Sequence, residues 1–497
     1  MTPRSPFADL TLGQRAPGRI ALTADWVLGH GAGGHRLLRR GEVVIEGGRI
    51  LHVGRRFPGE VARRIDAGPA LIAPGFVDLD ALSDLDTTTL ALEAGPSWAK
   101  GRVWPQSYVD RGPYEMYSPE ELAFQKRFAF AQLLLHGITS AAPIASLFYR
   151  AWGETVAEFD AAAEAAADLG LRVWLGPAYR AGGMVVTAPG QLEPRFDEAR
   201  GMAGLEAAAG FIRRQAGGHG GLINGLLAPD RVETCTEGLL HRTMDLAEEL
   251  DVPVRLHCAQ GRMERRTVAR LHGCTAPQWL ARAGLLGPRL MAPHATHATA
   301  EDLDLYAAHG VSVIHCPLVS ARFGEALDSL PGLRARGITV AMGTDTAPPD
   351  MLLNLAVGQM MARHVDPDHP VSAADMLDAA TLGGAAALRR DDIGRLAPGA
   401  CADIAVFDLA DAHMAPTIDP IRTLVLGASG RVARAVFVDG RLSMRDGCVA
   451  GLDMAAARAR AQAQFDGLVA RYPDRTWGHP PVADIFPASY PLEVCDA

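Results

Sequence analysis

The sequence predicts an α/β protein made of a (β/α)8 barrel, of the TIM-barrel type, and a small β-sandwich domain built from both ends of the chain. Eight short apolar segments with strand character recur between residues 71 and 345, and segments with helical periodicity lie between them. This alternation is typical of parallel strands that are connected by crossover helices. The chain has 497 residues, more than the roughly 250 to 300 that a single hydrophobic core usually holds, so a second domain is expected.

The two chain ends carry the short strands of the second domain. Residues 41–46 and 49–54 flank a glycine pair, which predicts a hairpin, and residues 402–407 and 434–441 repeat the short-strand pattern near the other end. We therefore expect both ends to contribute strands to one sandwich. The predicted division is 1–70 for the N-terminal part of the sandwich, 71–389 for the barrel, 390–450 for the C-terminal part of the sandwich, and 451–497 for a C-terminal helix and tail.

The barrel elements can be placed in order along the chain. The eight strands are expected at 71–80, 138–142, 171–175, 222–227, 252–259, 289–295, 311–315 and 338–345. Ser118 and Glu121 form a capping-box pattern with a proline at the first helical position, which predicts a helix to Leu135. Further helices are expected over 154–169 and 237–250. In this fold the chemistry takes place at the carboxyl ends of the strands, so polar residues there are the functional candidates.

Composition and charge restrict the class of partner. The net charge is −9, with 48% hydrophobic and 21% charged residues, which argues against a disordered chain and against nucleic acid as a partner. The N-terminus lacks the apolar core of a signal peptide, and no run reaches the roughly 18 apolar residues of a membrane helix, so we expect a cytoplasmic protein without membrane contact. Seven cysteines without a CxxC pair predict neither disulfides nor a zinc knuckle.

Three polar residues stand at the ends of predicted strands five, six and eight. They are His257, His294 and Asp345. Two imidazoles and a carboxylate at a barrel mouth suit one Zn²⁺ or Fe²⁺ ion with an open position for water. Taken singly, each histidine could instead be a hydrogen-bonded structural residue, and Asp345 could cap a helix. Their occurrence together on three strands of one barrel favours a site.

Five segments carry a resemblance to a known family: 74–77, 254–257, 293–297, 315–317 and 342–345. They resemble the amidohydrolase superfamily, and within it the aminohydrolase and chlorohydrolase branch, which includes triazine hydrolases and adenosine-type deaminases. The resemblance covers almost the whole chain and implies the barrel-plus-sandwich fold. It implies that His257 is a metal ligand, that His294 polarises substrate or water, and that Asp345 is both a ligand and the general base.

The chain departs from the family at the first metal-binding strand. Asp80 and Leu82 stand where the family has two histidines, the second histidine after strand five is Ala259, and the family's proton-shuttling glutamate falls on Arg262. Because a carboxylate binds Zn²⁺ at ordinary distances, Asp80 can supply an oxygen ligand beside the retained histidines and the strand-eight aspartate, and Asp78 or Asp84 are further oxygen candidates.

Lysine placement argues against a two-metal site. Lys100 and Lys126 are the only lysines, and neither falls on predicted strand four, where the resemblance would put a lysine that bridges two metals. One divalent metal, Zn or Fe, or no cofactor at all, is therefore expected.

The predicted function is hydrolysis of a C–N bond, by deamination or cyclic amide hydrolysis, in a small molecule, with heterocycles among the candidates. The predicted metal ligands are His257, Asp345, Asp80 and His294; the predicted catalytic residues are His294, Asp345, His297 and Arg262. Two alternatives stay open: a non-catalytic binding or assembly protein, and a metal-free lyase or isomerase that uses acid/base chemistry. The resemblance also implies a homodimer or higher homo-oligomer. The loop 84–117, rich in aromatic residues and arginines, is either a lid over a planar or anionic substrate or a packed segment.

Overall fold

The computed structural model describes residues 5–85, 96, 98–144, 147, 150–327, 330–493 and 495. Its centre is a parallel eight-stranded sheet, and all eight predicted strands are present. In sheet order these are β14 (Ile223–Gly225), β11 (Arg172–Leu175), β10 (Ile138–Ile144), β8 (Phe76–Leu82), β18 (Val340–Met342), β17 (Ser312–His315), β16 (Leu290–Pro293) and β15 (Val254–Arg255). A parallel bridge between Leu227 and Val254 closes the sheet, which confirms the barrel.

The single strand expected over 71–80 is in fact two strands. β7 (Ala70–Pro74) pairs with β19 (Ile404–Asp408) and β2 (Trp26–Gly31) outside the barrel, whereas β8 belongs to the barrel. Gly75 lies between them, and a Cβ at this position would lie 2.1 Å from the Thr139 side chain. Glycine is therefore needed where the chain leaves one sheet and enters the other, because β10 packs directly against that point.

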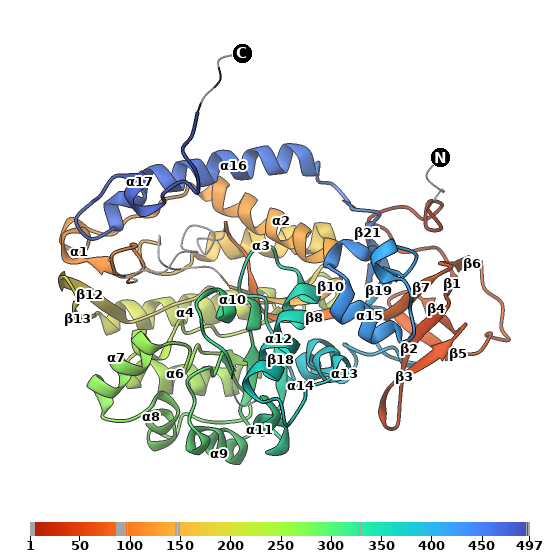
Figure 1. Cartoon of the computed structure of the whole chain (residues 1–497), viewed down its shortest axis with the longest axis horizontal. Coiled ribbons are helices and arrows are strands. Elements are labelled where there is room, and N and C mark those ends of the chain that lie inside the picture. Colours follow the sequence, from red (N-terminus) through yellow and green to blue (C-terminus); the bar gives the residue numbers. More distant parts are fainter. Residues whose placement is uncertain are drawn as a thin grey trace.

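The β-rich domain consists of two sheets, as Figure 1 shows at the end where the N-terminus lies. The four-stranded sheet has the order β5 (Arg49–Gly54), β4 (Glu42–Glu46), β1 (Arg19–Thr23) and β6 (Arg63–Asp66). The seven-stranded sheet has the order β22 (Cys448–Val449), β21 (Arg441–Arg445), β20 (Ala433–Val438), β19, β7, β2 and β3 (Gly34–Arg39). One buried cluster contains Val43, Ile72 and Val406, so strands from both chain ends share this core, as predicted.

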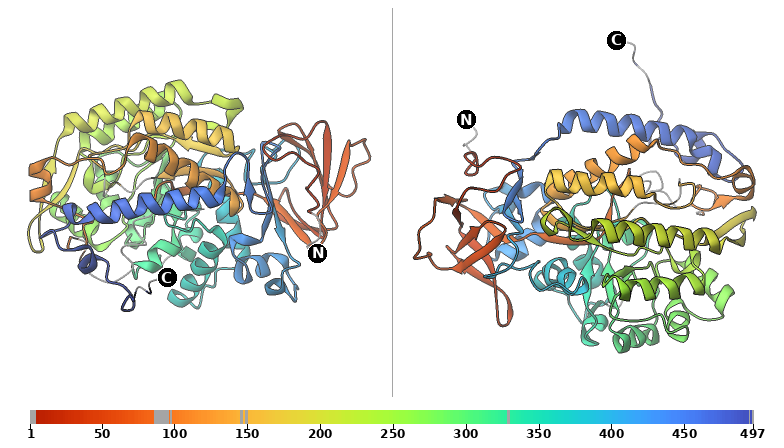
Figure 2. Two further views of the ribbon diagram at one scale, coloured as in Figure 1. Left: turned by 90° about the horizontal axis from the view of Figure 1, so that it is seen from above. Right: turned by 180° about the vertical axis from the view of Figure 1, so that it is seen from behind.

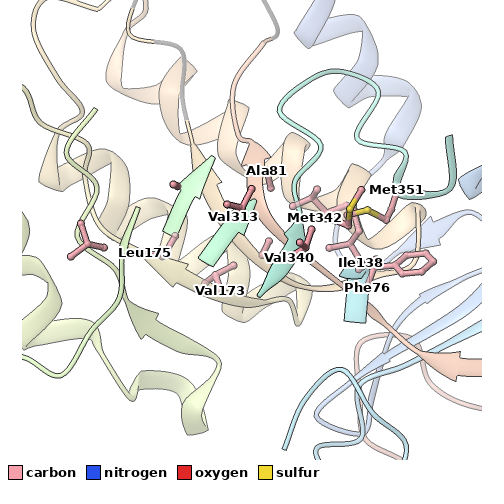
Figure 3. Packing of buried hydrophobic residues seen from close by; sticks show 14 of the residues in the cluster. Phe76, Ala81, Ile138, Val173, Leu175, Val313, Val340, Met342 and Met351 are labelled. Carbon is pink, nitrogen blue, oxygen red and sulfur yellow. The ribbon is translucent and has the colours of Figure 1, made fainter. Parts of the chain in front are cut away.

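Helices surround the barrel and bury its outer face. The main ones are α2 (Pro119–Leu135), α3 (Val156–Leu169), α4 (Glu198–Gln215), α6 (Glu237–Glu249), α7 (Arg262–His272), α8 (Ala276–Arg282), α9 (Ala300–His309), α10 (Pro317–Arg322), α11 (Leu330–Ala335), α12 (Met351–Val365) and α13 (Ala373–Asp378). The predicted capping box of Ser118 and Glu121 begins α2. Figure 3 shows part of the large apolar cluster, with Val173, Val313 and Met342 on the strands and Met351 on α12.

The described part of the loop from β8 to α2 and the C-terminal helix lie along one side of the barrel. Residues 86–95 and 97 of the predicted loop 84–117 lie outside the described residues. In the described part, β9 (Trp104–Pro105) joins β12 (Gly182–Ala188) and β13 (Gln191–Phe196) in a small sheet, at the end of the barrel opposite the β-rich domain (Figure 1). Helices α1 (Gln106–Arg111), α16 (Met454–Arg471) and α17 (Val482–Ile485) complete this layer and the tail, whereas α15 (Pro420–Gly427) packs against α12 and α13.

The described aromatic residues of this loop pack against neighbouring segments. Tyr108 and Tyr117 are buried, and the Arg180 guanidinium lies 4.6 Å from the centre of the Trp104 ring. Figure 2 shows α16 crossing this side of the barrel, while the β-rich domain stays at one end in both views. Among the described residues, no helix is long and apolar enough to cross a membrane.

Candidate metal centre

Four of the predicted site residues meet at the carboxyl end of the barrel. Asp80 lies on β8, His257 follows β15, His294 follows β16 and Asp345 follows β18. The donor atoms of Asp80, His257 and His294 all lie within 4.8 Å of one another, and these three side chains are buried. Asp80 Oδ2 is 3.5 Å from His257 Nε2 and 4.0 Å from His294 Nε2, while Asp345 Oδ2 is 3.5 Å from His294 Nε2. The structure thus brings together residues from four strands that are far apart in sequence.

The donor set fits one divalent ion. Zinc bonds of about 2.0 to 2.1 Å in tetrahedral geometry put neighbouring donors roughly 3.4 Å apart, close to the separations of these atoms. His257 Nδ1 is 2.7 Å from the Asp230 carbonyl oxygen, so this nitrogen donates its proton to that carbonyl and Nε2 is the ring nitrogen that faces Asp80. In the described part of the chain, both ring nitrogens of His294 and Oδ1 of Asp80 are buried without a hydrogen-bond partner. Buried polar atoms of this kind call for a ligand.

The backbone at this end of the barrel adopts an unusual conformation. Ala259, His294, Ala295 and Asp345 all have positive φ angles, of 56°, 76°, 52° and 43°. Non-glycine residues rarely occupy this region, and each such residue costs on the order of 1 to 3 kcal/mol. Their clustering at the ends of three strands around one group of side chains is typical of a functional site rather than of a simple connection.

Neighbouring side chains keep Asp80 ionised. Burial alone would raise the pKa of its carboxyl group, but His257, Arg255 and His294 outweigh burial and hold the pKa at about 2. The pKa of His294 is lowered well below its usual value, first by burial and then by the neighbouring His257. The centre therefore combines an anionic oxygen donor with a neutral imidazole, which is the protonation state that metal coordination requires.

Asp78 is structural rather than part of the cluster. Its Oδ1 accepts hydrogen bonds from the backbone N–H groups of Thr344 at 3.0 Å and of Asp80 at 3.2 Å, and its Oδ2 accepts the Thr344 hydroxyl at 2.6 Å. The Asp345 N–H also donates to the Asp80 carbonyl at 2.8 Å. These bonds join the ends of β8 and β18, so they fix Asp80 relative to Asp345.

The two other predicted site residues, His297 and Arg262, both contact Glu325. His297 Nε2 is 2.9 Å from Glu325 Oε2, and Arg262 Nε is 3.7 Å from Glu325 Oε1. The Arg262 side chain is 75% exposed, so the structure does not bring it to the four clustered residues. Leu82, at the end of β8, is buried. The catalytic roles of His297 and Arg262 stay predictions.

Both lysines and Cys258 point elsewhere. Lys126 is fully buried between Glu154 and Glu158, each 3.1 Å away, and donates to the Ser83 hydroxyl at 2.7 Å. Lys100 donates to a backbone carbonyl of α17. The Cys258 thiol accepts the Tyr306 hydroxyl at 3.1 Å on the outer side of the barrel, and burial raises its pKa well above the usual value.

Sequence reasoning missed two buried residues near the centre. Arg255 lies with Nε 3.5 Å from Asp80 Oδ1. Its position two residues before His257 could have revealed it, because alternate residues of a strand face the same side. Glu264 accepts the N–H groups of Ala259 at 2.5 Å and of Gln260 at 2.6 Å, and so holds the turn after β15. No local sequence pattern predicts this role of Glu264, because the backbone conformation of the turn decides which N–H groups its carboxyl group contacts.

A family model and curated relatives match most of this chain. The amidohydrolase family matches residues 74–443. The 5-methylthioadenosine/S-adenosylhomocysteine deaminase of Nitratidesulfovibrio vulgaris (strain DP4) is 30% identical over 433 residues, which cover 84% of this chain and 90% of that protein. The 5'-deoxyadenosine deaminase of Methanothermobacter thermautotrophicus is 28% identical over 418 residues, covering 82% and 90%.

Solved structures share the fold. An adenosine deaminase from Xanthomonas campestris with bound zinc superposes with a TM-score of 0.73 at 23% identity, covering 90% of this chain and 98% of that one. A variant of the atrazine chlorohydrolase from Arthrobacter aurescens TC1, complexed with zinc and atraton, gives a TM-score of 0.74 at 23% identity, with coverage of 90% and 100%. From the family match over most of its length and from its 30% identical relative, the chain belongs to the amidohydrolase family.

Proposed function

We propose that this protein is a hydrolase that removes the amino group from a small heterocyclic molecule, with one divalent metal ion at the barrel mouth. The observation that carries the proposal is the convergence of Asp80, His257, His294 and Asp345 at the carboxyl end of the barrel. Relatives of the chain that are named as deaminases of adenosine derivatives support the reaction class.

The metal would be held by Asp80, His257 and Asp345, with His294 beside it. When bound, a divalent ion such as Zn²⁺ or Fe²⁺ supplies a Lewis acid that lowers the pKa of water. His257 is oriented for this role by its bond to the Asp230 carbonyl. Asp80 supplies the negative charge that a histidine at this position would lack.

The reaction itself is a balanced hydrolysis. The oxygen of water bonds to the ring carbon that carries the amino group, the C–N bond breaks, and the amino group leaves as ammonia after it accepts a proton from that water. Asp345 is suited to take the proton from the attacking water, because its carboxylate lies at the mouth beside His294. His294 is neutral and buried, so its ring can orient the substrate or stabilise charge on the ring nitrogen next to the reacting carbon.

His297 and Arg262 would act at the rim. Both pair with Glu325, and an imidazole can either donate or accept a proton whereas a guanidinium cannot accept one. We therefore propose that His297 helps to move the proton to the leaving group and that Arg262 sets the local charge. A homo-oligomer and a cytoplasmic location are further proposals from the family resemblance.

The test combines metal analysis with an ammonia-release assay. Protein purified without chelator is expected to hold close to one equivalent of Zn or Fe per chain, measured by mass spectrometry. It is also expected to release ammonia from at least one of 5-methylthioadenosine, S-adenosylhomocysteine and 5'-deoxyadenosine. If reconstituted protein binds no metal, or releases no ammonia from any of them, the proposal fails, and a binding role or metal-free acid/base chemistry becomes the better explanation.

A further inference from the structure

A buried arginine lies directly beneath the candidate metal centre. The Arg255 side chain is 2% exposed and comes from β15, two residues before His257. Its Nη1 donates to the carbonyl oxygens of Ala142 at 2.7 Å and Leu79 at 3.3 Å, and its Nη2 donates to that of Pro143 at 2.9 Å. These carbonyls belong to β8 and β10, so the guanidinium is fixed by strands on the opposite side of the barrel.

The Nε–H of this guanidinium faces Asp80. Arg255 Nε is 3.5 Å from Asp80 Oδ1, and in the described part of the chain neither atom has a hydrogen-bond partner. The other carboxylate oxygen, Oδ2, faces His257 at 3.5 Å and His294 at 4.0 Å. The Asp80 carboxylate therefore has a fixed cation on one side and the two imidazole donors on the other.

We propose that Arg255 is the positioning residue of Asp80 and that its permanent charge weakens the binding of the divalent ion. The inference rests on the proposed function only in taking Asp80 as a ligand. A guanidinium stays protonated at every pH that the fold tolerates, so its charge is always present. Asp80 cannot give its full negative charge to the metal while it neutralises Arg255, and two cations that share one buried carboxylate repel each other.

The three hydrogen bonds from Arg255 to carbonyl oxygens would also serve a purely structural role. Substitutions can separate this structural role from the effect of the Arg255 charge on metal binding. Arg255→Gln removes the charge but keeps N–H groups that can donate to carbonyl oxygens, whereas Arg255→Lys keeps the charge without the planar fork. Arg172→Met is a matched control, because Arg172 is also buried in a barrel strand but pairs with Asp403 at 2.8 Å, away from the clustered ligands.

The experiment measures the zinc dissociation constant of metal-free protein by competition with a chromogenic chelator. Arg255→Gln and Arg255→Met are expected to bind Zn²⁺ at least about tenfold more tightly than the unmodified protein, while Arg255→Lys and Arg172→Met stay within about threefold of it. The inference is wrong if Arg255→Gln binds zinc no more tightly than the unmodified protein. It is also wrong if Arg255→Lys binds zinc as tightly as Arg255→Gln does.

Folding is monitored by circular dichroism with and without zinc. If the neutral variants fold only when zinc is added, the metal has replaced the missing cation, which supports the inference. If they fail to fold even with zinc, the role of Arg255 is structural and the inference is wrong.

The outcome is distinguishable from failure of the proposed function. Absence of ammonia release from every substrate refutes the deaminase proposal and leaves the comparison of zinc affinities unaffected. Zinc binding by Arg255→Gln but not by the unmodified protein would support the inference while contradicting the expected metal content. Absence of zinc binding in all variants overturns both.

Discussion

Replacement of Gly343 by alanine should disturb the metal centre without replacing a predicted ligand. A Cβ at this position would lie 2.6 Å from Asp80 Cβ, 2.9 Å from Cys316 Sγ and 2.9 Å from Ile314 Cγ2, whereas ordinary contact begins at 3.4 Å. The backbone of Gly343 cannot easily retreat, because its N–H donates to the His315 carbonyl at 3.0 Å and its carbonyl accepts the Asn354 amide at 2.9 Å. Asp80 must therefore move by most of an ångström.

The expected size of the effect follows from this overlap. Overpacking of a tight core costs about 1 to 3 kcal/mol, and burial of one added methyl group returns at most about 0.8 kcal/mol. We expect Gly343→Ala to lower the free energy of unfolding by about 1 to 2 kcal/mol. Because a displacement of about 1 Å in a catalytic arrangement can cost on the order of a hundredfold, kcat/KM for ammonia release should fall by roughly that factor.

Chemical denaturation and the ammonia-release assay test both numbers. Gly287→Ala is the matched control, because a Cβ at Gly287 meets no atom within 4 Å, and both quantities should stay at their unmodified values there. The proposed ligand set is wrong if Gly343→Ala has the stability of the unmodified protein and a kcat/KM within twofold of its value. In that case the activity does not depend on the observed position of Asp80.

Four further substitutions probe the centre and its surroundings. His257→Ala and Asp345→Ala should each remove the bound metal and abolish turnover, measured by mass spectrometry and ammonia release. Burial and a neighbouring glutamate raise the pKa of Glu264 from 4.5 to about 8, so the folded protein keeps a proton that the unfolded chain releases. Stability should therefore fall as pH rises from about 4.5 to 8, by up to about 4 kcal/mol, and Glu264→Gln should lack this fall in denaturation curves. Lys126→Met should cost about 3 to 5 kcal/mol of unfolding free energy, because it leaves the buried Glu154 without its cation.

Each of these expectations has a contrary outcome. Full activity in either ligand variant would refute the ligand assignment. Parallel stability curves for Glu264→Gln and the unmodified protein between pH 5 and 9 would show that Glu264 is ionised throughout. The control for Lys126→Met is Arg127→Met, because the exposed pair of Arg127 with Asp168 should contribute less than about 1 kcal/mol to the free energy of unfolding. If both variants lose the same unfolding free energy, the unpaired buried carboxylate is not the cause of the loss in Lys126→Met.

The sequence by itself determined the barrel and the position of its chemistry. Strand-like segments and helical periodicity are local properties, so all eight strands and the capping box of α2 could be placed without coordinates. His257, His294 and Asp345 stand at strand ends, and strand ends of a parallel barrel meet at one face. The replacement at Asp80 was likewise visible in the residues. The period-two alternation of strands also puts Arg255 on the same face as His257.

Only the tertiary structure decided which side chains meet. Asp78 and Asp80 lie on one strand and have the same functional group, yet Asp78 bonds to Thr344 while Asp80 faces the two histidines. That choice depends on the neighbouring strand β18, which arrives from more than 250 residues away in the sequence. The exposed position of Arg262 and the change of sheet at Gly75 depend in the same way on packing between distant segments. Local patterns fix which elements form, whereas partners are fixed by register and barrel closure, which bring together residues that no local pattern connects.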